Sequence, residues 1–150
     1  MKTFLTFALP CLAAFFLTAT PLAAAPESGK VTVAVGEVTV VAKAGDAPVA
    51  VKAGDTVAVG GTIKTGADAR AVVVMTARSA IRIGENSEVL LETVDETAQP
   101  KKVMIDLKDG SLSALLKPEA ADELDFRVRT PSGVAAARGT FFAVAVKDGK

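Results

Sequence analysis

The sequence predicts an all-β domain of many short antiparallel strands in a sandwich or roll, with at most one short helix. Valine alternates with small or polar residues over 31–40, and alternation with a period of two is typical of strands. Turn signals rich in Gly and Asp then recur about every eight to twelve residues, the spacing expected in a β-sandwich or barrel. With 150 residues, 50% of them hydrophobic and 23% charged, the chain suits a single domain with a modest core.

Residues 1–25 are expected to form a secretory signal peptide. Lys2 precedes an apolar run from Phe4 to Leu17, and Ala23, Ala24 and Ala25 close the segment. A positive start, an apolar centre and a small-residue end are the three parts of such a signal. An uncleaved membrane anchor is the alternative, because the segment is long enough to span a bilayer, but its prolines and its alanine-rich end disfavour an anchor. We expect cleavage after Ala24 or Ala25, which leaves a domain over 26–150.

The single cysteine, Cys11, lies inside this segment. Pro10 precedes it and the apolar run continues beyond it, unlike a lipoprotein signal, which needs small residues before the Cys at the end of the run. The mature chain is therefore expected to have neither disulfides nor thiolate chemistry. We expect a periplasmic or secreted location and no stable membrane span after cleavage.

The domain reads as a series of short strands. Asp109-Gly110 predicts a tight hairpin between the strands on either side of it, and 118–124 alone has a helical composition. The Asp148-Gly149 turn has no returning strand after it, so a continuation beyond Lys150 is left open. Strands are expected over 31–35, 38–40, 56–59, 70–76, 80–83, 88–94, 102–108, 111–116, 126–129 and 140–147.

Two short segments repeat at a spacing of nine, Lys43-Ala44-Gly45-Asp46 and Lys52-Ala53-Gly54-Asp55. Calcium-binding β-rolls also repeat every nine residues. Only two copies occur here, and Gly and Asp are adjacent rather than one residue apart. We therefore expect two similar turns between consecutive strands.

The composition excludes several classes of function. The chain has no histidine, the commonest general base and metal ligand. Without His and Cys, nucleophile systems and zinc sites are not expected, so we predict no metal, no cofactor and no enzymatic activity. Lys plus Arg and Asp plus Glu both number 17, so no basic excess supports nucleic-acid binding.

Carboxylates are the remaining candidates for chemistry, and they gather in two stretches. A glycosidase needs two carboxylates across a cleft, and sugar sites are usually lined with aromatic residues, which are scarce here. Both stretches are expected to lie on solvated strand edges and loops, although a weak calcium site at either is left open. The stretches comprise Glu85, Glu88, Glu92, Asp95 and Glu96, and Glu119, Asp122, Glu123 and Asp125.

The last third carries the most specific pattern. A strand at 126–129 leads into Thr130-Pro131-Ser132-Gly133, and a short apolar stretch then leads into Arg138-Gly139-Thr140 and the aromatic-apolar strand from Phe141. This order resembles the closing signature of the FecR domain family. Upstream segments resemble further blocks of that family over about residues 31 to 147. They are Gly36-Glu37-Val38, Ala53 to Val57 with Gly61 to Gly66, Ala71 to Met75, Ile81 to Ile83 with Asn86-Ser87, and Leu107 to Leu112.

The expected order of segments departs from that of the signalling members of the family, which favours an exported module. In signalling members of that family, a cytoplasmic anti-sigma region and a transmembrane helix precede the domain, whereas a signal peptide stands there in this sequence. We expect a binding or scaffold module of the cell envelope, with an envelope protein or a glycan as partner. The alternatives are a periplasmic component of a FecR-type signal-sensing, sigma-factor regulatory system and, less favoured, a carboxylate-dependent hydrolase.

The signature residues are expected to be structural. Pro131 lacks an N–H and ends the preceding strand, Gly133 suits a turn, and Gly139 allows a bend. Arg138 is expected to satisfy carbonyls or a carboxylate, with anion binding as the alternative. The predicted structural set is Thr130, Pro131, Gly133, Arg138, Gly139, Thr140 and Phe142.

The strand over 140–147 is apolar on both sides. Phe142, Val144 and Val146 alternate with Phe141, Ala143 and Ala145. Apolar residues on both faces are typical of a strand covered on both sides. We therefore expect this strand to be central in the stack of sheets.

Overall fold

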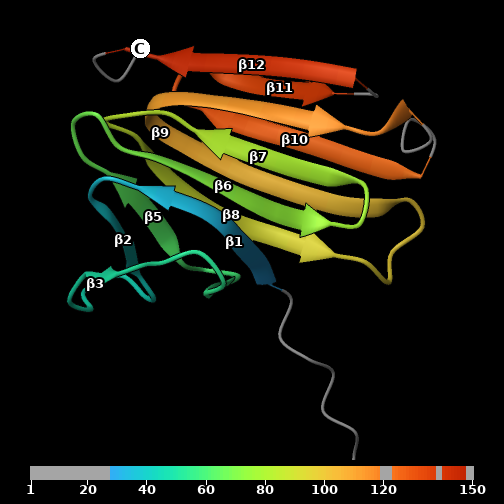
Figure 1. The fold of residues 1–150 in the computed structure, drawn as a ribbon. Coiled ribbons are helices and arrows are strands. Elements are labelled where there is room, and N and C mark those ends of the chain that lie inside the picture. Colours follow the sequence, from blue (N-terminus) through green and yellow to red (C-terminus); the bar gives the residue numbers. More distant parts are fainter. Residues whose placement is uncertain (1–27, 119–122, 138–139, 148–150) are drawn as a thin grey trace, which may run out of the picture.

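A computed structural model of the chain describes residues 28–118, 123–137 and 140–147. The predicted signal peptide lies outside these residues. Twelve strands form one curled sheet (Figure 1), so the all-β prediction is confirmed. The strands are β1 (Ser28–Val35), β2 (Val38–Val41), β3 (Val49–Ala50), β4 (Thr56–Ala58), β5 (Thr62–Thr65), β6 (Arg70–Thr76), β7 (Ser79–Ile83), β8 (Glu88–Asp95), β9 (Lys101–Leu116), β10 (Leu124–Thr130), β11 (Gly133–Ala137) and β12 (Thr140–Val146).

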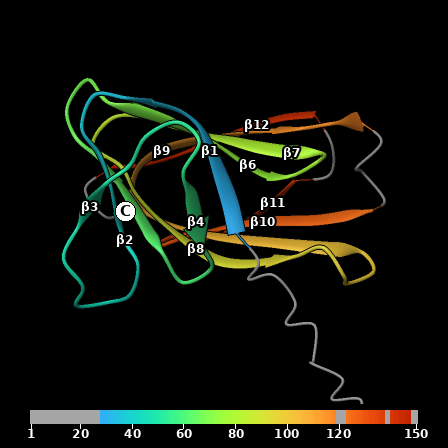
Figure 2. The same ribbon diagram turned by 60° about the horizontal axis from the view of Figure 1, so that its bottom comes forward.

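Strand β9 belongs to two layers and connects them. Its first part pairs with β8 and β10, and its last part pairs with β7 and β12. The strand order β4-β1-β6-β7-β9-β12 forms one layer, which we call layer I. The order β3-β2-β5-β8-β9-β10-β11 forms layer II. Figure 2 shows β6, β7 and β12 lying over β8 and β10.

The prediction of a hairpin at Asp109-Gly110 is wrong. The chain continues through both residues as one strand of 16 residues. Gly110 adopts a φ of +87°, so it redirects β9 from layer II into layer I rather than reversing it. The two halves of β9 therefore face different neighbours and do not pair with each other.

The core lies between the two layers and follows the period-2 alternation. In layer I, Val73, Ile81 and Leu112 are buried, and in layer II, Leu91 and Ile105 are buried. Full burial of such a side chain contributes about 1.5–3 kcal/mol. The largest fully buried side chains are Phe126, Ile63, Ile81, Ile83, Leu91, Ile105, Leu107, Leu112, Val31, Val57, Val73 and Val89.

One pairing in the structure is parallel rather than antiparallel. Strand β10 pairs with β9 in parallel, with Leu124 beside Lys101, because the chain crosses back after the end of β9.

Of the stretch 118–124 that was predicted to be helical, 119–122 lie outside the described residues, and Leu124 already belongs to β10. In the described ranges, no helix is long and apolar enough to cross a membrane.

The two repeated turns are confirmed. The amide of Asp46 donates to the Lys43 carbonyl (3.0 Å), and the amide of Asp55 donates to the Lys52 carbonyl (3.1 Å). In both turns the glycine has a positive φ, +97° and +101°. A positive φ at the third position of a four-residue turn is the requirement of a type II turn, which explains the Gly before Asp.

Candidate functional site

The first block of the signature forms a surface hairpin between β10 and β11. Thr130 pairs with Gly133 across the turn, and the Thr130 hydroxyl donates to the Gly133 carbonyl at 3.1 Å. Pro131 and Ser132 occupy the two exposed turn positions. Gly133 has a φ of +155°, which side chains with a Cβ rarely adopt. This block therefore closes the hairpin.

The second block leads into β12. Arg138 and Gly139 lie outside the described residues, and Thr140 begins β12 opposite Leu116. Phe142 is partly buried against the core. The predicted central position of this strand is wrong, because β12 pairs only with β9 in the described structure. On the face of β12 that points away from the core, Phe141 is 69% exposed.

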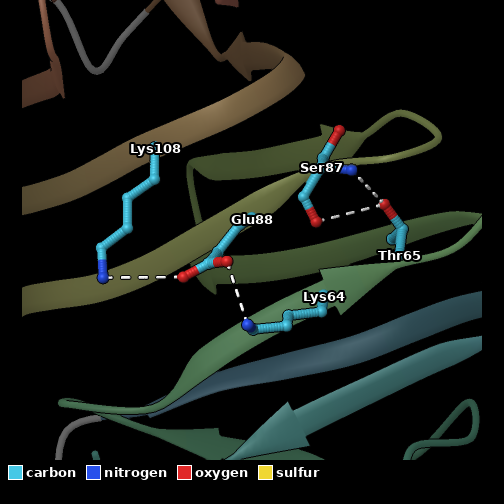
Figure 3. Close-up of polar contacts among 5 residues, drawn as sticks. All are labelled: Lys64, Thr65, Ser87, Glu88 and Lys108. Carbon is cyan, nitrogen blue, oxygen red and sulfur yellow. Dashed lines mark hydrogen bonds and ion pairs between the residues drawn. The ribbon is translucent and has the colours of Figure 1, made fainter. Parts of the chain in front are cut away.

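Three upstream family-like blocks meet at the bend of β9, which the sequence alone did not predict. Thr65, from the end of β5, and Ser87, from the turn before β8, are both buried (Figure 3). The Thr65 hydroxyl donates to the Gly84 carbonyl at 2.6 Å and accepts from the Ser87 amide at 2.9 Å. The Ser87 hydroxyl accepts from the Ser111 amide at 3.0 Å. These contacts hold the end of β5 and the turn before β8 against the bend.

The outer face of layer II is covered by ion pairs. Glu88 lies between Lys64 (3.0 Å) and Lys108 (3.6 Å), as Figure 3 shows. Arg129 pairs with Glu92 at 3.0 Å. The hydrogen bond from Lys64, together with both lysine charges, lowers the pKa of Glu88 against a smaller opposing effect of burial. Positive and negative side chains thus balance each other on this face.

The outer face of layer I is different. Phe141 pairs with Leu115 across β12 and β9, and these side chains are 69% and 62% exposed. Beside them is a hollow of about 250 Å³. It is lined by Val72, Ala80, Ile81, Arg82, Ser113, Leu115 and Phe141.

Charge on layer I has one sign. Its strands carry Lys30, Arg70 and Arg82, and the described residues of β1, β4, β6, β7, β12 and the 110–116 part of β9 include no Asp or Glu. None of these three cations forms an ion pair within the described part of the chain. In the part of the chain that the structure describes, layer I therefore presents an apolar surface with cations and without balancing carboxylates.

Comparison with known proteins agrees with the blocks that the structure brings together. The family described as FecR protein matches residues 61–150, which is more than half of the chain. The chain belongs to the FecR family. No curated protein and no solved structure matches it. FecR domains are associated with periplasmic signal-sensing regulators and with the cell envelope.

The acidic stretches of this FecR domain have structural contacts. The Asp95 carboxylate accepts from the Thr97 hydroxyl (2.7 Å) and from the amides of Thr97 and Ala98 (both 2.9 Å), and these bonds lower its pKa. Of the second stretch, Glu119 and Asp122 lie outside the described residues. Within the described ranges, no group of three or more acidic residues is arranged to hold a metal ion.

A second hollow of the FecR domain, of about 500 Å³, lies beside the loop between β8 and β9. It is lined by Ala98, Gln99, Pro100, Lys101 and Glu123. Among the described residues that line it, Glu123 is the one with a carboxylate, and that group forms an ion pair with Arg78.

Proposed function

We propose that this protein is an exported, non-catalytic FecR-family module that binds a partner protein in the cell envelope through the outer face of layer I. The exposed Phe141–Leu115 pair beside the Arg82 hollow carries the proposal. Exposed apolar patches with polar margins are typical of interaction sites. On the ion-paired outer face of layer II, the described residues include no two exposed large apolar side chains that pair across strands; the exposed Val134 lies opposite Arg129.

The chemistry of the face favours a protein over a glycan. Phe141 is its only aromatic residue among those described, so it lacks the aromatic platforms of sugar sites. Its cations are unbalanced, so a partner that offers apolar side chains and carboxylates complements it. Exposed charge pairs are screened over about 8 Å at physiological salt, and we expect binding to weaken as salt increases.

Site-specific photocross-linking in cells tests the binding surface. A photoreactive residue in place of Leu115 is expected to give a protein adduct in the envelope fraction, and the same residue in place of Arg127, on the ion-paired face, is not. Arg82→Glu should reduce the Leu115 adduct severalfold. Equal adducts from both faces, or an adduct unaffected by Arg82→Glu, would contradict this assignment.

We propose that the protein is not catalytic because its candidate carboxylates are held in ion pairs. A general acid needs a raised pKa near neutrality, whereas the lysines around Glu88 lower its pKa, and Glu92 is engaged by Arg129. Purified protein should therefore turn over no glycosidase, esterase or peptidase substrate. Turnover that copurifies with the protein and disappears in Glu88→Gln or Glu92→Gln would reverse the proposal.

Export is tested by mass. Protein isolated from the envelope should lack about 25 residues by intact-mass measurement, because the signal-peptide pattern ends at Ala25. A membrane-bound product that retains Lys2 would contradict export as a cleaved domain.

Membership of the FecR family favours a second candidate, a periplasmic component of a signal-sensing system. In that case, deletion of the gene should change the output of a sigma-factor reporter, and Arg82→Glu should reproduce the deletion. If deletion leaves the reporter unchanged, the signal-sensing role is rejected and the scaffold role remains.

A further inference from the structure

The hollow on the outer face of layer I is formed by an alternation of short and long side chains. Ala80 on β7 lies opposite Leu115 on β9. Two residues further along the same pair of strands, Arg82 lies opposite Ser113, and residues two apart on a strand share one face of the sheet. Phe141 lies opposite Leu115 on the next strand. Each short side chain therefore leaves space beside a longer one, over the paired strands β7, β9 and β12.

The size of the hollow fits one side chain. Its volume is about 250 Å³, smaller than the range of about 300–1,000 Å³ that is usual for sites holding a cofactor or a drug-sized molecule. Val72, Ala80, Leu115 and Phe141 supply apolar walls. We therefore expect a partner to insert a single large apolar residue, the kind of buried anchor that dominates many protein interfaces.

Two hydrogen-bond donors accompany these apolar walls. Arg82 and Ser113 both line the hollow and lie directly opposite each other. Arg82 forms no ion pair with a described residue. A guanidinium matches a carboxylate with two parallel hydrogen bonds, and a serine hydroxyl can donate to a carboxylate oxygen. The polar side of the hollow therefore suits a carboxylate.

The carboxylate and the apolar side chain have to come from nearly the same position of the ligand, because Arg82 lines the same hollow as Leu115 and Phe141. An internal Asp or Glu carries its carboxylate on its own side chain, so the apolar anchor is then a different residue. The C-terminal residue of a protein has both groups on one Cα. Capture of a terminal carboxylate is also a recurring mode of peptide recognition.

We propose that the hollow binds the C-terminal residue of a partner protein, with its apolar side chain beside Leu115 and Phe141 and its carboxylate on Arg82 and Ser113. This assignment rests on the proposed function, because it names the part of the partner that the outer face of layer I binds. It requires a free carboxylate at the end of the partner.

NMR titration of isotope-labelled protein purified from the envelope tests the site. N-acetyl-phenylalanine, which carries both groups on one residue, should shift the signals of the residues that line the hollow, with a dissociation constant of about millimolar because the ligand is small. N-acetyl-phenylalaninamide lacks the carboxylate and should bind about tenfold more weakly. N-acetyl-glutamyl-phenylalaninamide restores the negative charge at an internal position and should bind no better than that amide.

Two arginine variants test the carboxylate contact. Arg82→Gln should weaken the binding of N-acetyl-phenylalanine about tenfold and leave the binding of its amide unchanged. The matched control is Arg70→Gln, which removes a cation from layer I that does not line the hollow and should change neither value. Both side chains are exposed, so both variants should keep the wild-type melting temperature.

Three outcomes would overturn the proposal. They are the absence of shifts at the residues that line the hollow, equal affinities for N-acetyl-phenylalanine and its amide, and an equal affinity for the glutamyl amide, which would assign the face to an internal acidic segment. If the titration fails and the photocross-link from Leu115 persists, the C-terminal assignment is rejected and partner binding remains. If the cross-link fails and N-acetyl-phenylalanine binds, the partner protein is rejected and the carboxylate site remains.

Discussion

Ser87 packs so closely against Gly110 that no side chain fits at position 110. A β-carbon built on Gly110 would lie 2.6 Å from the β-carbon of Ser87, and Gly110 also has a φ of +87°. The glycine therefore serves the bend of β9 in two ways. It adopts the left-handed conformation, and it lets the turn before β8 approach the backbone.

Gly110→Ala should be strongly destabilising. A non-glycine residue with left-handed backbone costs about 1–2 kcal/mol, and overpacking adds about 1–3 kcal/mol. Gly54→Ala is the matched control, because Gly54 has a φ of +101° and nothing within 4 Å of its built β-carbon, so only the first cost applies. Urea unfolding measures both, and equal losses would show that Ser87 does not restrict position 110.

Thr65→Val should destabilise the fold by about 1–3 kcal/mol. It removes the hydroxyl that bonds the Ser87 amide and the Gly84 carbonyl, and both groups then lose a buried partner. Thr62→Val, on the outer side of the same strand, is the control and should change stability little. Equal unfolding midpoints for the two variants would contradict a structural role for this hydroxyl.

The Glu88 ion pairs should contribute stability that depends on pH. The pKa of Glu88 is lowered from 4.5 in the folded chain, first by the hydrogen bond from Lys64. The contribution is therefore present above about pH 4.5 and is lost as the pH falls through the folded value. It should be less than about 1 kcal/mol, because the pairs lie at the surface.

Unfolding measurements at pH 7 and pH 3 test this contribution. Glu88→Gln should lower stability at pH 7 and leave it nearly unchanged at pH 3. Glu96→Gln, in an exposed loop, is the control and should change neither value. A Glu88→Gln effect of the same size at both pH values would mean that its charge is not responsible.

Two neighbouring phenylalanines should differ in their contribution to stability. Phe142→Ala should cost about 1–3 kcal/mol, less than the 3–5 kcal/mol of a fully buried Phe, because Phe142 is partly buried. Phe141→Ala should stay within about 0.5 kcal/mol, because its side chain is exposed. Thermal unfolding of the two variants compares them, and the reverse order would mean that β12 presents its other face to the core.

Arg138→Ala tests whether the Arg-Gly-Thr block is architectural, as we propose. The variant should lower the melting temperature, because a guanidinium that satisfies carbonyls or a carboxylate loses those bonds. Arg127→Ala, which removes an exposed ion pair with Asp125, is the control with a small effect. An unchanged melting temperature together with loss of the Leu115 cross-link would instead assign Arg138 to recognition.

The sequence by itself determined the strand-rich class, the two Gly-Asp turns and the alternation within β12. Each of these is a local property, because the side-chain direction in a strand has a period of two and a positive φ requires glycine. The division of β12 into one side with Phe142, Val144 and Val146 and another with Phe141, Ala143 and Ala145 was therefore predicted correctly, whereas the covering of both sides was not. Membership of the FecR family also followed from short blocks whose order can be read directly.

Only the tertiary structure decided which strands are neighbours. An Asp-Gly pair has the same local sequence in a hairpin and in a strand that bends. The close contact with Ser87 shows that Gly110 lies at a bend within β9. The apolar composition of β12 fits either a central or an edge strand, and among the described strands β12 pairs with β9 alone. These outcomes depend on contacts between residues far apart in the chain, which no local pattern encodes.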